Sequence, residues 1–167
     1  MLASGDELWN TYAAGTYNGI AFDHTASDAE IHSYTADAEY VLPYWSEREL
    51  DVLFDTKTSW DTSTPGDYLA SASNMLAAMG TGYQFMHMAT HGNYTIWGTE
   101  SGYFSSSTIT GMTGSVNVAI VSTIACLTGG FDRADSSLSE AFLRSADTGT
   151  IVYLGCSRYG WGYASYI

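Results

Sequence analysis

The chain has 167 residues, of which 46% are hydrophobic, so it is long enough and apolar enough to fold around one core. Its 18 acidic and 5 basic residues give a formal net charge of −13. This charge excludes nucleic acid and anionic membrane surfaces as expected partners, because both would repel the protein. No stretch reaches the roughly 20 apolar residues of a membrane helix, and the first ten residues lack a signal-peptide pattern, so we expect no membrane insertion.

The first part of the chain, residues 1–49, has weak hydrophobic periodicity, and we interpret it as a loop-rich segment. Within it, a short helix is predicted over Thr25–Ser33, opened by a Thr cap, with Ile31 on its inner side. We find no strand pattern in this segment. Residues 50–167 are interpreted as the core of a domain.

That core begins with Leu50–Asp55, which has the apolar density of a short buried strand. A helix is predicted from Tyr68 or Leu69 to Met79, because apolar residues recur there at helical spacing. The nearly continuous apolar run Tyr83–Thr90 predicts a strand buried on both faces, as in a parallel sheet. We interpret Asn93–Thr113, which is polar and rich in glycine, as a long surface connection with one short helix near residues 105–110.

A second strand is predicted at Val116–Ala125, which is rich in β-branched residues. Ser137 and Glu140 have the spacing of a capping box and predict the start of a helix. Thr150–Leu154 is predicted to be another buried strand. Strands and helices in alternation favour a mostly parallel α/β sheet with helices on both faces.

Two of these strands end in side chains that can do chemistry. His91 and Gly92 follow the first apolar run, and Cys126 follows the second. Reacting groups gather at the carboxyl ends of parallel strands, where a histidine can favour the thiolate of a nearby cysteine. The backbone N–H groups of Gly92 and Cys126 can then hold an oxyanion. A single cysteine or histidine is more often structural, but the two together favour a catalytic site.

Three sequence blocks resemble the gingipain family of cysteine peptidases, which belongs to the clan shared with caspases and legumain. The blocks are Met86–Asn93 followed by Trp97 and Gly98, then Ile124–Gly129, then Leu138–Leu143. The resemblance covers residues 50 to 161, approximately. It implies a caspase-like three-layer α/β sandwich, present here as an incomplete domain, and endopeptidase activity through an acyl-enzyme.

The resemblance also implies roles for particular residues. His91 and Cys126 match the catalytic dyad, and Ser157 and Trp161 match by position the pocket for the residue before the scissile bond. The family prefers Arg or Lys there, which is compatible with the acidic chain. Asp55, at a strand end, is a candidate to orient the histidine. We expect a protein or peptide substrate, no required cofactor, and a secreted or cell-surface protein; a structural calcium ion is left open.

Several alternatives stay open. Cys126 and Cys156 are either free or bridged, and a bridge would abolish catalysis because an oxidised sulfur cannot attack; Cys156 is also an alternative nucleophile. His87 and His91 form an H-x-x-x-H pair, but Met88 stands where a zinc peptidase helix carries Glu, so we expect no metal site. The second functional hypothesis is a non-catalytic surface or adhesion domain that keeps the peptidase scaffold.

Overall fold

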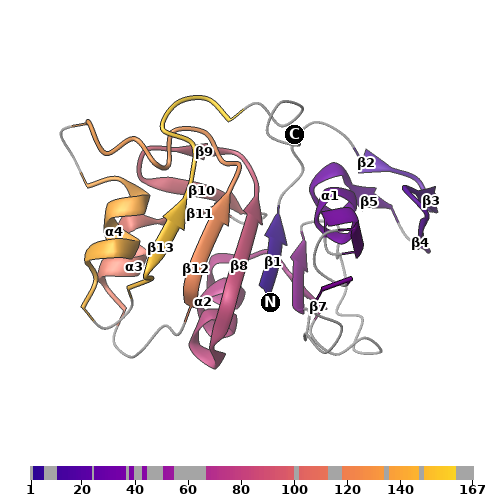
Figure 1. Cartoon of the computed structure of the whole chain (residues 1–167), viewed down its shortest axis with the longest axis horizontal. Helices are drawn as coiled ribbons and strands as arrows, with labels where there is room; N and C mark the ends of the chain where they lie inside the picture. The colour runs from indigo at the N-terminus through magenta and orange to yellow at the C-terminus, as the bar shows by residue number, and fades with distance from the viewer. Residues whose placement is uncertain are drawn as a thin grey trace.

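In the computed structural model, six described strands form one parallel sheet (Figure 1). Its order is β13-β12-β8-β1-β6-β7. The strand bounds are Leu2–Gly5 (β1), Asp51–Phe54 (β6), Asp67–Leu69 (β7), Tyr83–Ala89 (β8), Val118–Thr123 (β12) and Val152–Leu154 (β13). The structure describes residues 2–5, 11–23, 25–36, 38–39, 43–44, 51–54, 67–99, 102–112, 118–133, 136–146 and 149–160. The predicted α/β class with a mostly parallel sheet is confirmed.

The first strand, β1, corrects the sequence analysis, which finds no strand before residue 50. It lies between β8 and β6, where Leu2 pairs with Met86 on one side and with Asp51 on the other. A strand of four residues that includes Ser4 and Gly5 has too little apolar character to be recognised by pattern. A strand from the beginning of the chain therefore lies inside the sheet that carries the later strands.

A small β region and one helix follow β1 in the chain. The strands β2 (Thr11–Tyr12) and β5 (Ala26–Ser27) pair, and β3 (Gly15–Tyr17) and β4 (Ile20–Phe22) form a hairpin. Asn18 and Gly19 make the hairpin turn with φ angles of 51° and 80°, as the Asn-Gly pair favours. Helix α1 (Asp28–Ala36) begins three residues later than predicted. Ile31 is buried, as predicted.

Three helices cover one face of the sheet, namely α2 (Ala72–Thr81), α3 (Ser106–Thr110) and α4 (Leu138–Arg144). They share a core with Met86, Met88 and Val121 of the central strands. The opposite face is packed by α1, where Ala29 contacts Ala89. None of the described helices is both long and apolar enough to cross a membrane.

The segment predicted as a surface connection is instead partly buried. It forms a three-stranded antiparallel sheet, made of β9 (Gly92–Asn93), β10 (Ile96–Thr99) and β11 (Gly102–Ser105). Trp97 and Phe104 are fully buried, with ring centroids 5.5 Å apart, and Trp97 also contacts Phe142 of α4 at 5.2 Å. Pattern analysis missed these strands because they are only two to four residues long and each contains a glycine. The short helix predicted in this segment is confirmed as α3.

Two further predictions concern the strand β13 and the capping box of α4; the first is corrected and the second is confirmed. The strand predicted as buried, β13, has a single neighbour among the described strands, and Val152 and Leu154 are 37% and 55% exposed. Tyr153, between them, points into the core against Trp97. The capping box that opens α4 at Ser137 is confirmed.

Candidate active site

The carboxyl ends of β8 and β12 lie side by side, because the two strands are parallel neighbours. Thr123 is opposite Met88, and the Ile124 N–H donates to the Met88 carbonyl at 3.2 Å, which continues the ladder beyond β12. Cys126 and His91 each lie three residues beyond the pair Thr123–Met88, in the segments that follow the two strands. Neighbouring strands lie about 4.8 Å apart, so both residues follow strand ends that lie close together.

Gly92 gives direct evidence that the two ends meet. A β-carbon built on this glycine would lie 2.7 Å from the Ala125 β-carbon and 2.9 Å from the Cys126 carbonyl oxygen. These distances are too short for any side chain. The residue after His91 is therefore glycine because the Cys126 backbone packs against it.

The turn after the cysteine has an unusual backbone. Leu127 has a φ of 64°, in the left-handed region that costs a non-glycine residue about 1 kcal/mol. Two hydrogen bonds hold it there, from the Leu127 N–H to the Arg158 carbonyl at 2.6 Å and from the Gly130 N–H to the Leu127 carbonyl at 2.9 Å. Among the described residues, the Cys126 N–H has no hydrogen-bond acceptor. The strained turn thus leaves the cysteine and its amide at the end of the strand.

Helix α4 supports this turn through its first residues. The Thr128 hydroxyl donates to the Ala125 carbonyl at 3.1 Å, and the Thr128 carbonyl accepts from the Ser139 N–H at 3.0 Å. The start of the helix is in turn fixed by the capping box, in which the Ser137 N–H donates to Glu140 Oε2 at 2.9 Å. The helix cap therefore positions the backbone beside Cys126.

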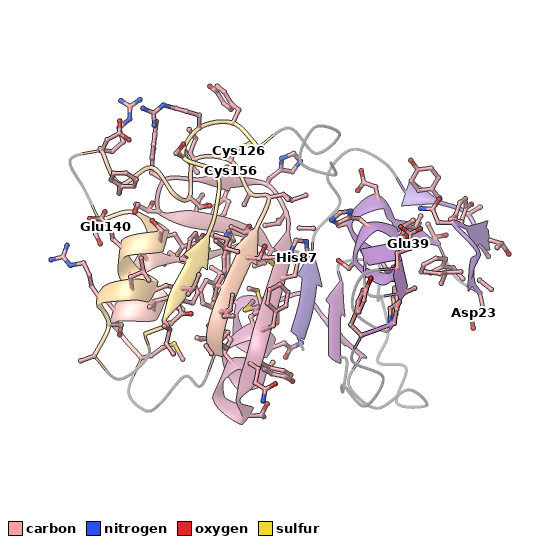
Figure 2. All side chains as sticks on the ribbon, viewed as in Figure 1. Asp23, Glu39, His87, Cys126, Glu140 and Cys156 are labelled. Atoms are coloured by element: carbon pink, nitrogen blue, oxygen red, sulfur yellow. The ribbon has the colours of Figure 1, made fainter. Side chains whose placement is uncertain are left out.

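The segment after β13 packs against the turn that contains Cys126. The Gly129 N–H donates to the Cys156 carbonyl at 3.0 Å, and Cys126 Sγ lies 3.7 Å from the Gly160 carbonyl oxygen. A β-carbon on Gly160 would lie 2.9 Å from Cys156 Sγ and would collide with the Ile124 carbonyl. Both cysteines are free thiols and partly buried, and Figure 2 shows them at the same end of the sheet.

An ion pair links the segment after β12, which contains Cys126, to the segment after β13, which contains Cys156. The Arg158 guanidinium donates to both carboxylate oxygens of Asp132, at 3.0 and 2.9 Å, on the exposed surface. The hydrogen bond from Arg158 lowers the pKa of Asp132. Burial, with a smaller contribution from Cys126, raises the pKa of the Cys156 thiol. At neutral pH the Cys156 side chain is therefore mainly the protonated thiol.

The two histidines of the H-x-x-x-H pair have different surroundings. His91 is exposed just after β8. His87 lies within the strand (Figure 2) and is mostly buried. The His87 ring lies 5.5 Å from that of His32 in α1. Burial, and to a smaller extent His32, lowers the pKa of His87 to about 4, so the ring is neutral at pH 7. The described part of the chain contains no group of three or more metal-ligating side chains.

The remaining predicted site residues are placed as follows. Ser157 is exposed after β13, and its carbonyl accepts a hydrogen bond of 2.7 Å from the Arg158 side chain. Asp55 and Trp161 lie outside the described residues. Sequence reasoning missed Gly160, whose contact with both cysteines is visible only in the fold. A lone glycine between two aromatic residues is the one signal that marks it.

Comparisons with known proteins show the family and the fold of the chain. The model of peptidase family C25 matches residues 2–166. The crystal structure of the Arg-specific cysteine proteinase gingipain R matches with a TM-score of 0.58 and 20% identity, over 90% of this chain and 31% of that one. The complex of the pro- and mature domains of Porphyromonas gingivalis RgpB matches with a TM-score of 0.57 and 20% identity, over the same shares of 90% and 31%. A structure described only as a protease matches with a TM-score of 0.52 and 21% identity, over 60% of this chain and 23% of that one.

The chain thus spans about a third of the gingipain chains that it matches. At 20% identity these structures show a shared fold. None of the curated proteins compared with the chain matches it. The family match covers nearly the whole sequence, and the chain belongs to peptidase family C25.

Proposed function

We propose that this chain carries the catalytic dyad of a cysteine endopeptidase, with Cys126 as nucleophile and His91 as its proton-transfer partner. The observation that carries the proposal is the packing of the two strand ends. His91 and Cys126 each lie three residues beyond the last pair of β8 and β12, and Gly92 lies against the Cys126 carbonyl. Membership of a peptidase family supports the reaction class.

The proposed reaction is acyl transfer in two steps. His91 accepts the proton of the Cys126 thiol, and the sulfur attacks the carbonyl carbon of the scissile peptide bond. His91 then donates the proton to the leaving amine, and the acyl group remains on sulfur as a thioester. In the second step, water deprotonated by His91 attacks the thioester and releases the new carboxyl end.

Two backbone N–H groups are suited to the oxyanion that forms on attack. One is that of Cys126, which has no acceptor among the described residues. The other is that of Gly92. The Gly98 N–H donates to the His91 carbonyl at 2.8 Å, so His91 and Gly98 form a hydrogen-bonded pair. Because such pairs alternate along antiparallel strands, the Gly92 N–H points away from β10 and is available to a substrate.

Cys156 fits the role of nucleophile less well. It follows β13, which β12 separates from β8, so the strand that delivers His91 is not its neighbour. Burial also raises the pKa of the Cys156 thiol, which lowers its share of the reactive thiolate. The position next to the histidine strand favours Cys126.

We also propose that the peptidase prefers substrates with Arg or Lys before the scissile bond. An acidic chain, with 18 acidic against 5 basic residues, attracts basic peptides. One structural neighbour is described as an Arg-specific cysteine proteinase. Asp132 does not supply the negative charge for such a pocket without rearrangement, because Arg158 already binds both of its carboxylate oxygens.

The test combines active-site labelling with peptide hydrolysis. Iodoacetamide at neutral pH is expected to alkylate Cys126 faster than Cys156, and His91→Ala should abolish the difference. A matched set of fluorogenic peptides with Arg, Lys, Ala or Asp before the cleaved bond should be hydrolysed best with Arg or Lys. Cys126→Ala should remove hydrolysis, whereas Cys156→Ala should retain it.

Two results would refute the proposal. Slow labelling of Cys126 that does not depend on His91, with no hydrolysis of any peptide, would favour the non-catalytic surface domain instead. Hydrolysis that survives Cys126→Ala and is lost in Cys156→Ala would move the nucleophile to the second cysteine.

A further inference from the structure

Cys126 and Cys156 share one neighbour, Gly160. Cys126 Sγ lies 3.7 Å from the Gly160 carbonyl oxygen, and the side-chain position of Gly160 is 2.9 Å from Cys156 Sγ. Gly160 cannot carry a side chain, because a β-carbon would collide with the Ile124 carbonyl. Both thiols therefore border the same small space.

The backbone wraps around Cys156 in the same way. Ser122 is opposite Leu154, so the register continued by two residues sets Ile124 opposite Cys156. Gly129 then returns to donate its N–H to the Cys156 carbonyl at 3.0 Å. Cys126 lies in the turn between these two contact points. A disulfide between Cys126 and Cys156 needs their α-carbons to lie about 4.4 to 6.8 Å apart.

We propose that Cys156 is a resolving cysteine, which forms a reversible disulfide with Cys126 when the nucleophile is oxidised. This modification site rests on the proposed function, because it switches that same nucleophile off. It would also protect Cys126 from irreversible oxidation. Cys156 follows β13, which is not a neighbour of the strand that precedes His91. It therefore takes no part in the proposed dyad and is needed only after Cys126 is oxidised.

The chemistry requires a peroxide as oxidant and balances in two steps. The Cys126 thiolate attacks one oxygen of hydrogen peroxide, which forms a sulfenic acid and, after proton uptake by the leaving hydroxide, releases one water. The Cys156 sulfur then attacks the sulfenic sulfur, the S–O bond breaks, and a second water leaves with the Cys156 proton. Two thiols are oxidised by two electrons, and the peroxide is reduced. A dithiol reductant reverses the change by exchange.

The pairing is tested by mass measurement on the full chain, which needs no enzymatic activity. After treatment with hydrogen peroxide and blocking of remaining thiols, the wild type should lose two hydrogen atoms and show one cross-linked peptide that contains both cysteines. Cys156→Ser should show no cross-link, and its Cys126 should gain oxygen atoms and react with dimedone. Cys126→Ser should show neither change, which controls for nonspecific oxidation.

Peptidase activity gives a second readout. Dithiothreitol should restore the wild type fully after peroxide treatment, whereas Cys156→Ser should lose activity in proportion to its sulfinic acid. A wild type that gains oxygen on Cys126 without forming the cross-link, or that forms it only between two chains, would overturn the proposal. A cross-linked wild type without peptidase activity under reducing conditions would support the pairing and refute the proposed function.

Discussion

A β-carbon on Gly92 would lie 2.9 Å from the Cys126 carbonyl oxygen, so the residue after His91 and the cysteine backbone are in direct contact. We predict that Gly92→Ala separates the two strand ends. Overpacking of this kind costs about 1–3 kcal/mol of unfolding free energy. A displacement of reacting groups by 1 Å reduces catalysis about 100-fold, so kcat/KM should fall by roughly that factor.

The matched control is Gly80→Ala in α2, where no atom of the described residues lies within 4 Å of the added β-carbon. This substitution should raise the unfolding free energy by about 0.5–1 kcal/mol, because alanine favours the helix. Thermal melts and peptide hydrolysis by both variants check the prediction. Equal effects of the two substitutions would show that the contact at Gly92 does not matter.

The features that the sequence predicted are those with local causes. The strands that precede His91 and Cys126 are mostly apolar runs, and the capping box is a fixed spacing of three positions, from Ser137 to Glu140. The features that it did not predict depend on distant partners. Leu2–Gly5 becomes a central strand because β8 and β6 offer hydrogen bonds on both sides, and nothing in its four residues indicates this.

The same distinction applies to the site. A sequence shows that Cys126 follows a strand, but its contact with Gly160 depends on how two loops after neighbouring strands fold together. The buried position of Trp97 likewise depends on Phe104 and Phe142, which come from different elements. The exposure of Val152 and Leu154 follows from the edge position of β13, which an apolar pattern does not reveal.

The buried His87 predicts an acid-sensitive fold. Burial lowers its pKa from 6.5 to about 4 in the folded chain. Between these values the unfolded chain binds a proton that the folded chain does not, so the free energy of unfolding falls as the pH is lowered. At 1.36 kcal/mol per pKa unit, the loss between pH 7 and pH 4 is about 3 kcal/mol. The pKa of His32 is also lowered by burial, which adds a change of the same sign.

Urea unfolding at pH 7, 6, 5 and 4 checks this prediction. His87→Gln carries no proton, so its free energy of unfolding should fall by about 3 kcal/mol less than that of the wild type over this range. His91→Gln removes an exposed imidazole and serves as the control. Parallel curves for the wild type and His87→Gln would contradict the proposed cause.

Trp97 of β10 lies in a cluster of aromatic rings, so we predict a large loss of stability when its side chain is removed. Trp97 is fully buried and contacts Phe104, Phe142 and Tyr153. Trp97→Ala should lower the free energy of unfolding by about 3–5 kcal/mol, because it leaves a cavity among these rings. Tyr103 on the neighbouring strand is 68% exposed, so Tyr103→Ala should have a much smaller effect in the same urea titration. Similar losses would show that the cluster contributes little.

The cap of α4 links stability to the cysteine turn. The Ser137 side chain is buried and accepts a hydrogen bond of 3.3 Å from the Glu140 N–H. In the same first turn of the helix, the Ser139 N–H donates to the Thr128 carbonyl. Ser137→Ala should therefore cost about 1 kcal/mol and increase fraying of the first helical turn. Because Thr128 also holds the backbone beside Cys126, we expect faster hydrogen exchange of the Ser139 amide together with a changed rate of Cys126 alkylation.

The control for this last substitution is Ser136→Ala at the neighbouring exposed position. It should leave the melting temperature, the exchange rate and the alkylation rate as in the wild type. If Ser137→Ala lowers stability without altering either rate, the cap stabilises α4 alone, and the loop beside Cys126 is held by its own hydrogen bonds to Arg158 and Cys156. If all three readouts change together, the capping box positions the nucleophile through Thr128, as the hydrogen bonds indicate.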